Sequence, residues 1–311
     1  MTSRRTVVVL GPTASGKSDV AMAVAEAMAV AGAMPSGSVH VTAADAMQVY
    51  RRMDIGTAKP TAEDRVRVPH HGLDLVEPNE RYTVARYIAD VSVQRDAITA
   101  AGAREIIVGG TGLYVTALVD GLTMPGEWPE IRADLETNAD TADMWERLRT
   151  LDAQAAARIE PGNRRRIVRA LEVCLGSGRP FSSFGDGVAA FPPTDIAQVG
   201  LRWTRDALRE RIARRVHRMV ADGLVDEVEG LLAEPTGLSP TARQALGYKE
   251  IIDHLEGRCS LDESVAAVIL RTQQFAVRQE RWYRRDPRIE WIDIRRDPIA
   301  EVTPRVTQLL A

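Results

Sequence analysis

The feature that most constrains this chain is a glycine loop near its N-terminus, at residues 11–18. An apolar run at residues 7–10 precedes the loop, and an alanine-rich, helix-prone run at residues 19–31 follows it. A strand, a glycine loop and a helix with the spacing G-x-x-x-x-G-K-[ST] are typical of a phosphate-binding loop. We therefore predict an α/β fold, a P-loop NTPase-like parallel sheet flanked by helices. The alternative is a glycine turn that merely joins a strand to a helix.

Each residue type in this loop suits the binding of a phosphate chain. Gly11 and Gly16 let the backbone turn tightly and approach an anion without a Cβ in the way. The N–H groups of the loop and the positive end of the following helix favour negative charge. Lys17 adds a point charge, and Ser18 is a candidate Mg²⁺ ligand through its hydroxyl. The expected diphosphate- or nucleotide-binding residues are Gly11, Pro12, Thr13, Ala14, Ser15, Gly16, Lys17 and Ser18.

Length and composition limit the class of protein. The chain has 311 residues, of which 45% are hydrophobic and 27% charged, so it can bury a full core and should form one large domain or two. It has no apolar run of about 18 residues, so we expect no membrane span. Cys174 and Cys259 are too few and too far apart for a disulfide framework or a cysteine zinc site. We expect a cytoplasmic protein.

The order of the expected elements predicts two domains. Residues 1–122 and 195–311 should form the α/β core, and residues 123–194 a mostly helical insertion. Besides the first strand, the expected strands are residues 39–43, 105–108, 196–203 and 288–292, with a short one after the turn at 70–75. The expected helices are residues 83–101, 113–119, 130–135, 143–150, 153–159, 164–175, 205–222, 225–233, 239–255 and 260–286.

Asp45 follows the second expected strand, at the edge of the sheet where open parallel α/β proteins bind ligands. It could hold Mg²⁺, act as a general base or cap a turn, and all three roles stay open. The mixture of polar and large side chains at residues 46–51 favours a site. A second glycine turn, at residues 109–112, lies at another carboxyl edge. The pair His70-His71 suits a metal poorly, because adjacent side chains diverge and no third ligand has suitable spacing.

Arginines gather on three expected helices, although the net charge of −3 shows no global preference for nucleic acid. Arg164, Arg165 and Arg166 begin one helix, where cations oppose the helix dipole by roughly 0.3–1 kcal/mol each unless a polyanion offsets them. The other two stripes are Arg211, Arg215 and Arg218, and Arg271, Gln274, Arg278, Arg281 and Arg285. Three stripes suggest a long polyanion, with a solvated arginine face as the alternative for the first. Phe275 and Trp282 are expected in the core rather than as base-stacking platforms.

Together these motifs resemble the tRNA dimethylallyltransferase family, also called isopentenyl-diphosphate:tRNA transferase. The matching segments are residues 11–18, 45–60, 69–71, 109–114, 166–173, 245–248 and 278–285. The segment at 45–60 is highly specific, whereas the glycine loop alone is not. Ala46 stands where the family usually has serine, which puts a minor contact in doubt, and Val168 replaces a more polar residue.

The resemblance implies transfer of a dimethylallyl group from dimethylallyl diphosphate to the exocyclic N6 amine of the adenosine 3′-adjacent to the anticodon, with release of diphosphate. It implies that the glycine loop holds the prenyl diphosphate, with Mg²⁺, in place of a nucleotide. The implied catalytic residues are Asp45, Thr13, Lys17 and Arg215. The implied contacts to the tRNA anticodon stem-loop are Asp45, Ala46, Met47, Gln48, Thr111, Arg132, Arg165, Arg166, Ile167, Val168, Arg169, Arg243, Gly247, Tyr248 and Arg278. We expect the chain to act as a monomer.

Two other classes use the same loop. A small-molecule kinase would bind and consume ATP there, whereas prenyl transfer needs no nucleotide. A non-catalytic P-loop protein that binds RNA or regulates a partner would tolerate the loss of Asp45. These differences make the three readings separable by experiment.

Overall fold

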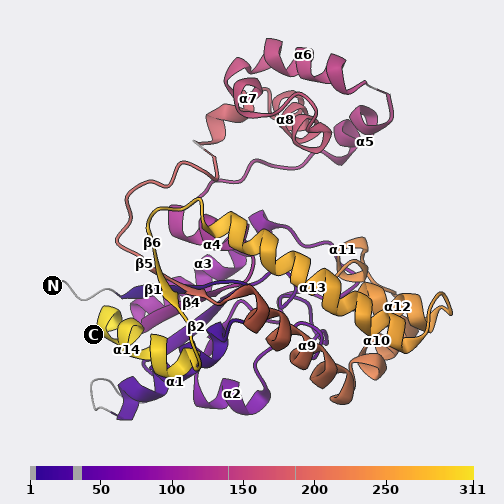
Figure 1. Cartoon of the computed structure of the whole chain (residues 1–311). Helices are drawn as coiled ribbons and strands as arrows, with labels where there is room; N and C mark the ends of the chain where they lie inside the picture. The colour runs from indigo at the N-terminus through magenta and orange to yellow at the C-terminus, as the bar shows by residue number, and fades with distance from the viewer. Residues whose placement is uncertain (1–4, 31–36, 139, 186) are drawn as a thin grey trace. The chain divides into compact units, whose positions relative to one another are not determined.

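A parallel six-stranded sheet forms the centre of the computed structural model, which describes residues 5–30, 37–138, 140–185 and 187–311 (Figure 1). The strand order is β3-β2-β4-β1-β5-β6, and every neighbouring pair is parallel. The strands are β1 (Thr6–Leu10), β2 (Val39–Ala44), β3 (His70–His71), β4 (Arg104–Gly109), β5 (Ala197–Arg202) and β6 (Ile289–Asp293). The predicted parallel sheet is confirmed.

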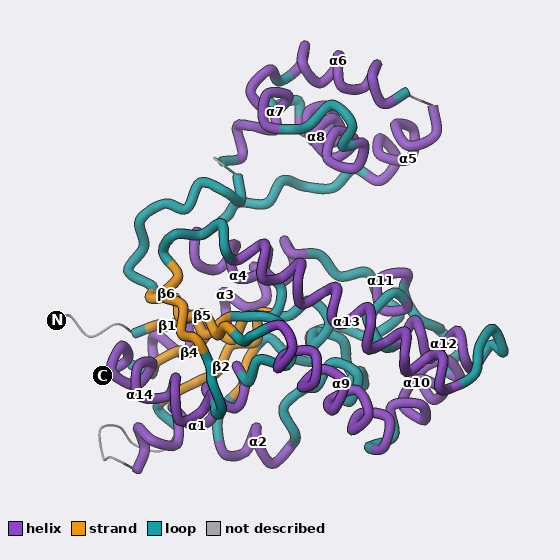
Figure 2. The backbone as a smooth tube through the Cα atoms, in the orientation of Figure 1, coloured by secondary structure: helices purple, strands orange, loops and turns teal. Residues whose placement is uncertain are grey.

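Helices cover both faces of the sheet, as Figure 2 shows in purple beside the orange strands. Alternate residues of β1 serve the two faces, because successive side chains of a strand point to opposite sides. Val7 and Val9 pack with α1 (Lys17–Val30) and α14 (Pro298–Leu310) in one apolar cluster. Val8 and Leu10 belong to the other cluster, with α3 (Val84–Ala100), α4 (Gly112–Asp120), α10 (Leu224–Ala233) and α12 (Tyr248–Leu255). A sheet buried on both faces explains the near-continuous valine and isoleucine runs.

The chain divides into two compact units, one formed by Met1–Val119 with Pro193–Ala311 and the other by Asp120–Pro192. The second unit lies close in sequence to the predicted insertion at 123–194. It contains α5 (Pro129–Asn138), α6 (Thr141–Leu151), α7 (Ala153–Arg158), α8 (Arg164–Ser177) and the short 3₁₀ helix η1 (Phe181–Phe184). These helices bury a core of their own, which includes Leu135, Met144, Leu148, Ile167 and Leu171.

The prediction of a single helix at 239–255 is wrong. The structure has α11 (Pro240–Arg243) and α12, separated by residues 244–247. Gly247 has φ +91°, a conformation that favours glycine and ends helical continuity. The sequence also failed to predict α2 (Ala62–Arg67) and α14. Each begins at a side-chain cap, Thr61 and Asp297 respectively.

The remaining long helices, α9 (Arg205–Ala221) and α13 (Leu261–Tyr283), follow the predicted ranges to within three residues and pack against each other. α13 contributes Tyr283 to the core beside the sheet and Val268 and Ala276 to a smaller cluster with α9. Among the described residues, no helix combines the length and apolar character that crossing a membrane requires.

Candidate active site

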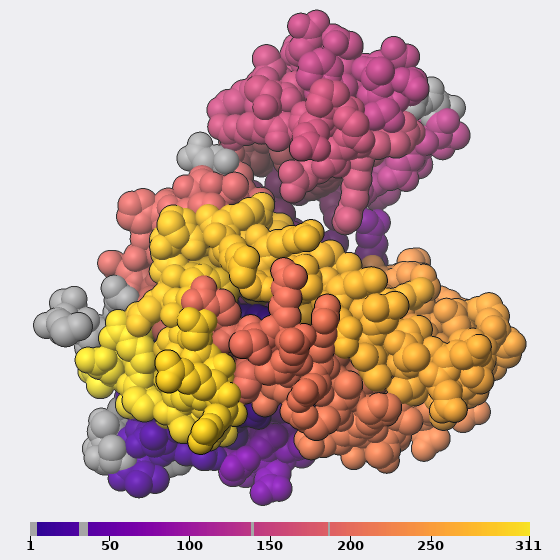
Figure 3. Space-filling model, viewed as in Figure 1, coloured from indigo at the N-terminus to yellow at the C-terminus, as the bar shows by residue number. Residues whose placement is uncertain are grey.

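A cavity of about 1470 Å³ opens in the α/β unit, beyond the carboxyl ends of β1, β2 and β4. This is the edge at which open parallel sheets bind ligands. Its walls are the glycine loop, the segment from Asp45 to Ala62, the Gly110–Thr111 turn, and one face each of α9 and α13. In Figure 3 the indigo N-terminal part of the chain is visible at the bottom of a hollow between the orange and yellow segments.

The glycine loop is shaped so that only glycine fits at its two ends. Gly11 has φ +148°, and a Cβ there would lie 2.9 Å from the Leu201 carbonyl oxygen. Gly16 has φ +96°, and a Cβ there would lie 2.6 Å from Pro298 Cγ. Among the described residues, Ser15 Oγ is buried and finds no hydrogen-bond partner. Ser15 is not among the residues that line the cavity.

Lys17 forms no ion pair with any carboxylate of the described residues. Its Nζ donates to the Pro12 carbonyl oxygen at 2.8 Å. Burial and, to a lesser extent, the positive charge of Arg215 lower the pKa of Lys17 to about 7, against the opposing effects of Asp45 and Asp19. Burial also lowers the pKa of Arg215, which α9 presents to the same cavity. Two cations held together in this way favour a bound anion of high charge density.

Asp45 turns the chain as it leaves β2. Its Oδ1 accepts hydrogen bonds from the backbone N–H groups of Met47, at 2.8 Å, and Gln48, at 3.4 Å. Its Oδ2 faces Gly110, where a Cβ would lie only 2.6 Å away. Asp45 lines the cavity with Lys17 and Arg215. Asp45 therefore both caps the turn after β2 and lines the cavity.

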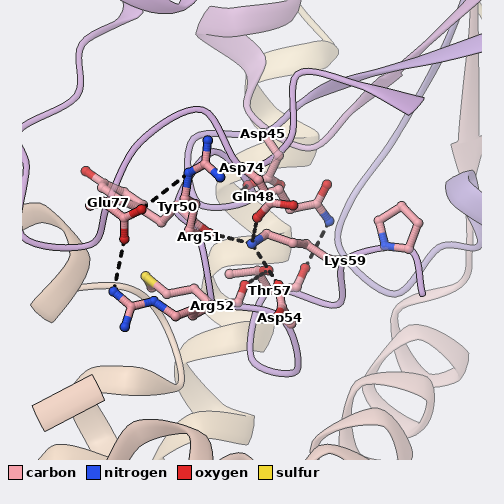
Figure 4. Close-up of polar contacts among 12 residues, drawn as sticks. Asp45, Gln48, Tyr50, Arg51, Arg52, Asp54, Thr57, Lys59, Asp74 and Glu77 are labelled. Atoms are coloured by element: carbon pink, nitrogen blue, oxygen red, sulfur yellow. Dashed lines mark hydrogen bonds and ion pairs between the residues drawn. The ribbon is translucent and has the colours of Figure 1, made fainter. Parts of the chain in front are cut away.

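The segment after Asp45 is held by a buried lysine (Figure 4). The Lys59 side chain is 1% exposed, and its Nζ pairs with Asp54 at 2.8 Å and Asp74 at 2.7 Å and donates to the Tyr50 carbonyl. Gln48 Nε2 donates to the carbonyl oxygens of Thr57, at 3.0 Å, and Ala58, at 3.2 Å. Two carboxylates and a carbonyl satisfy this buried ammonium, so Lys59 stabilises the shape of the cavity wall.

Glu227 of α10 supports the cavity wall, and the sequence did not reveal this contact. Its carboxylate accepts the backbone N–H groups of residues 54, 55 and 56 at 2.9, 2.7 and 3.2 Å. It also accepts the Tyr248 hydroxyl at 2.5 Å. Tyr248 is fully buried and lies so close to Gly56 that a Cβ on Gly56 would be 2.4 Å from its ring. Tyr248 was predicted to contact tRNA, but here its side chain is enclosed and joins α12 to the cavity wall.

Most other predicted site residues of this unit line the cavity. Ala46, Met47, Gln48, Thr111, Gly247 and Arg278 do so. Thr111 Oγ1 accepts the Ala46 N–H at 3.0 Å, which ties the second glycine turn to the segment after β2. Arg243 is not among the lining residues and instead pairs with Glu256.

The prediction for the two aromatic residues of α13 is correct for one of them. Trp282 is partly buried and packs against the apolar cluster beside the sheet and against Gly112. Phe275 lines the cavity instead of the core, with the Arg278 guanidinium 5.7 Å from its ring centroid. The spacing of seven residues places both on one helix face, but α13 passes from the core to the cavity along its length.

Residues 48–286 match the model of the family described as IPP transferase. The chain belongs to the IPP transferase family. It is 45% identical over 294 residues to the tRNA dimethylallyltransferase of Geobacter sulfurreducens, covering 92% of this chain and 91% of that protein. It is 44% identical over 309 residues to the tRNA dimethylallyltransferase of Kineococcus radiotolerans, covering 98% and 96%. The predicted resemblance is confirmed, and these relatives do not support the kinase alternative.

Solved structures agree with this family assignment. The tRNA isopentenylpyrophosphate transferase of Bacillus halodurans is 32% identical, with a TM-score of 0.68, and the match covers 99% of this chain and 97% of that one. A eukaryotic dimethylallyltransferase acting on tRNA has a TM-score of 0.79 at 23% identity, with 97% and 77% covered, which shows a shared fold.

The helical unit of this IPP transferase family member holds the remaining predicted tRNA contacts. Arg165 and Arg166 are exposed at the start of α8. Arg169 pairs with the buried Glu172 at 3.0 Å, and Arg132 pairs with Glu136 at 3.2 Å. Ile167 and Val168 are buried in the core of this unit, which contradicts a direct side-chain contact of these two residues with tRNA. The 3.6-residue helical period turns them inward while their arginine neighbours face solvent.

Proposed function

We propose that this chain transfers a dimethylallyl group from dimethylallyl diphosphate to the exocyclic N6 amine of the adenosine 3′-adjacent to the anticodon in tRNA. The proposal rests on one observation: a single cavity holds the glycine loop, the cations Lys17 and Arg215, and the carboxylate of Asp45 at the end of the neighbouring strand. The names of the relatives supply the class of acceptor and donor.

Departure of diphosphate is the step that the loop would assist. The C–O bond of the allylic diphosphate breaks and its electron pair leaves with the oxygen, so negative charge grows on the diphosphate. Lys17, Arg215 and the N–H groups at the start of α1 would stabilise that charge. Because the pKa of Lys17 is lowered to about 7, a bound polyanion would raise it and keep the ammonium protonated.

Asp45 is the group that we assign as general base. The N6 amine of adenine is a poor nucleophile because its lone pair is delocalised into the ring. As N6 forms its bond to the allylic carbon, its proton would pass to the Asp45 carboxylate. The adenosine must leave its base stack to reach this cavity, as expected for enzymes that modify a base. Phe275, on the cavity wall, is available to stack against it.

Mg²⁺ fits the donor set of this site. Hydroxyl and carboxylate oxygens are the ligands Mg²⁺ prefers, and Ser18 and Asp19 bring them to the cavity. Among the described residues no three His, Cys, Asp or Glu side chains group to hold a metal alone, so Mg²⁺ would be shared with the diphosphate oxygens. When bound, it would neutralise charge on the leaving group.

The tRNA would also contact the helical unit through Arg165 and Arg166, which are exposed on α8. We propose that the protein acts as a monomer. A tRNA acceptor also implies that the reaction takes place in the cytoplasm.

Radiolabelled dimethylallyl diphosphate and a synthetic anticodon stem-loop test this function. Label should enter the RNA with Mg²⁺ and without ATP. An otherwise identical stem-loop with guanosine at the position 3′ of the anticodon is the matched control and should stay unlabelled. Labelling of both RNAs, or of neither, would refute the proposal, and ATP consumption with a small-molecule acceptor would favour a kinase.

A further inference from the structure

We infer that Gln279, a buried glutamine of α13, is a positioning residue that sets the separation between the leaving-group end and the base end of the site. The inference rests on the proposed function. Gln279 is 6% exposed and lines the cavity, although neither role assigned above requires it.

The amide of Gln279 joins two backbone segments that are far apart in sequence. The Thr13 N–H donates to Gln279 Oε1 at 2.8 Å, and Gln279 Nε2 donates to the Gly110 carbonyl oxygen at 2.6 Å. One partner is a backbone donor and the other a backbone acceptor, so the two ends of the amide cannot be exchanged. The side chain is therefore a bridge of defined orientation between the glycine loop after β1 and the turn after β4.

The turn after β4 is tied in its own right to Asp45. The N–H groups of Gly110 and Thr111 both donate to the Ala44 carbonyl oxygen, at 3.2 and 3.0 Å. Thr111 Oγ1 accepts the Ala46 N–H at 3.0 Å. Gly110 lies against Asp45 Oδ2 so closely that it has no room for a Cβ. A shift of this turn would therefore move the carboxylate.

These contacts form one path from Thr13 through Gln279 and Gly110 to Asp45. In the sheet, β4 lies between β1 and β2, but ladder hydrogen bonds end with the strands and do not fix the loops beyond them. A reaction that loses diphosphate at one end and a proton at the other depends on this spacing. A misplacement of about 1 Å can lower a rate about 10²-fold.

The residue type fits this role. A carboxylate at position 279 could accept the Thr13 N–H but could not donate to the Gly110 carbonyl while ionised. It would also place a negative charge beside the diphosphate. An apolar side chain of similar size would fill the space and lose both bonds.

The test compares steady-state kinetics of the wild type, Gln279→Met and Gln279→Glu, using dimethylallyl diphosphate and the anticodon stem-loop. We expect Gln279→Met to lower kcat by about 10–100-fold. KM for both substrates and the affinity for inorganic diphosphate should change less than about threefold, because the change affects geometry rather than binding.

Ser264→Ala is the matched control. Ser264 is buried on the same helix and its Oγ donates to the Glu250 carbonyl oxygen at 2.8 Å, outside the cavity lining. It should lower the melting temperature without changing kcat per folded molecule. Gln279→Glu is the second variant, isosteric and expected to fold, with kcat again reduced.

Three results would overturn the inference. They are an unchanged kcat with a raised donor KM, a wild-type kcat in Gln279→Glu, and a loss in Gln279→Met equal to its unfolded fraction. A wild type that transfers no label would instead refute the proposed function, so the two failures are distinguishable.

Discussion

Two lysines of the same cavity wall have opposite environments. Lys59 lies between Asp54 and Asp74, so its buried charge is compensated by the protein itself. Lys17 has only the Pro12 carbonyl as its hydrogen-bond partner among the described residues, and burial lowers its pKa to about 7. The comparison teaches that a buried cation already paired by carboxylates maintains structure, whereas a buried cation that no carboxylate pairs is available to an anionic ligand.

The largest expected effect concerns Asp45, which lines the same cavity as Lys17. Asp45→Asn keeps the size and most hydrogen bonds but removes proton acceptance, so turnover should fall by about 10²–10⁴. Affinity for donor and tRNA should change little in equilibrium binding measurements. Recovery of the rate at high Mg²⁺ would show that Asp45 is mainly a metal ligand. A lower melting temperature with normal turnover would show that Asp45 only stabilises the turn after β2.

Lys17→Met should lower kcat/KM for dimethylallyl diphosphate by about 10²–10³, the usual loss when one group that stabilises developing charge is removed. The melting temperature should stay the same or rise, because the variant removes an uncompensated charge. Kinetics and thermal unfolding on one preparation check both parts. Transfer at the wild-type rate would exclude the loop as the diphosphate site.

Lys59→Met should have the opposite effect to Lys17→Met on stability, because Lys59 is paired with carboxylates and Lys17 is not. It removes the cation shared by Asp54 and Asp74 and leaves the Tyr50 carbonyl without its donor, while Arg65 still pairs with Asp74. We expect a loss of about 1–3 kcal/mol in the free energy of unfolding by urea titration. Lys59→Arg is a control that keeps the charge. If Lys59→Met were as stable as the wild type, the description of Lys59 as a structural cation would be wrong.

The titration of Lys17 gives a smaller effect with a defined sign. The free protein holds Lys17 protonated below pH 7 and increasingly neutral above it. Affinity for inorganic diphosphate should therefore fall about tenfold between pH 6 and pH 8, measured by calorimetry. The Lys17→Met variant is the control, because its pH profile reports the protonation of diphosphate without that of Lys17. Parallel pH profiles of the two proteins would contradict the prediction.

The lowered pKa of Lys17 also makes the free energy of unfolding depend on pH. The sign is opposite to that for a lysine whose pKa is raised by a carboxylate partner. Because the pKa is lower in the folded protein than in the unfolded chain, charging Lys17 destabilises the fold. That cost is fully present below pH 7 and is lost as the pH rises towards 10.5.

The smallest expected effect tests cations outside the cavity. The exposed pair Arg165→Glu and Arg166→Glu should weaken stem-loop binding several-fold and reduce the slope of log affinity against log salt by about 1–2. Arg169 is a poor choice for this test, because it pairs with the buried Glu172. An unchanged slope would mean that Arg165 and Arg166 form only a solvated face.

The sequence by itself determined the glycine loop, the parallel strands and the family. These depend on local spacing, such as the interval from Gly11 to Ser18, and on runs of residues buried on both faces of a sheet. Asp45 was recognisable because it directly follows a strand. The sequence also indicated which helices carry arginine stripes.

Only the tertiary structure decided which polar residues pair with one another. Lys59 meets Asp74, Glu227 meets the backbone of residues 54–56, and Gln279 meets Thr13 across 266 positions. It also decided that Tyr248, Ile167 and Val168 are buried. Burial and charge compensation depend on neighbours brought together by folding, so two lysines that look alike in the sequence acquire different chemistry in the folded chain.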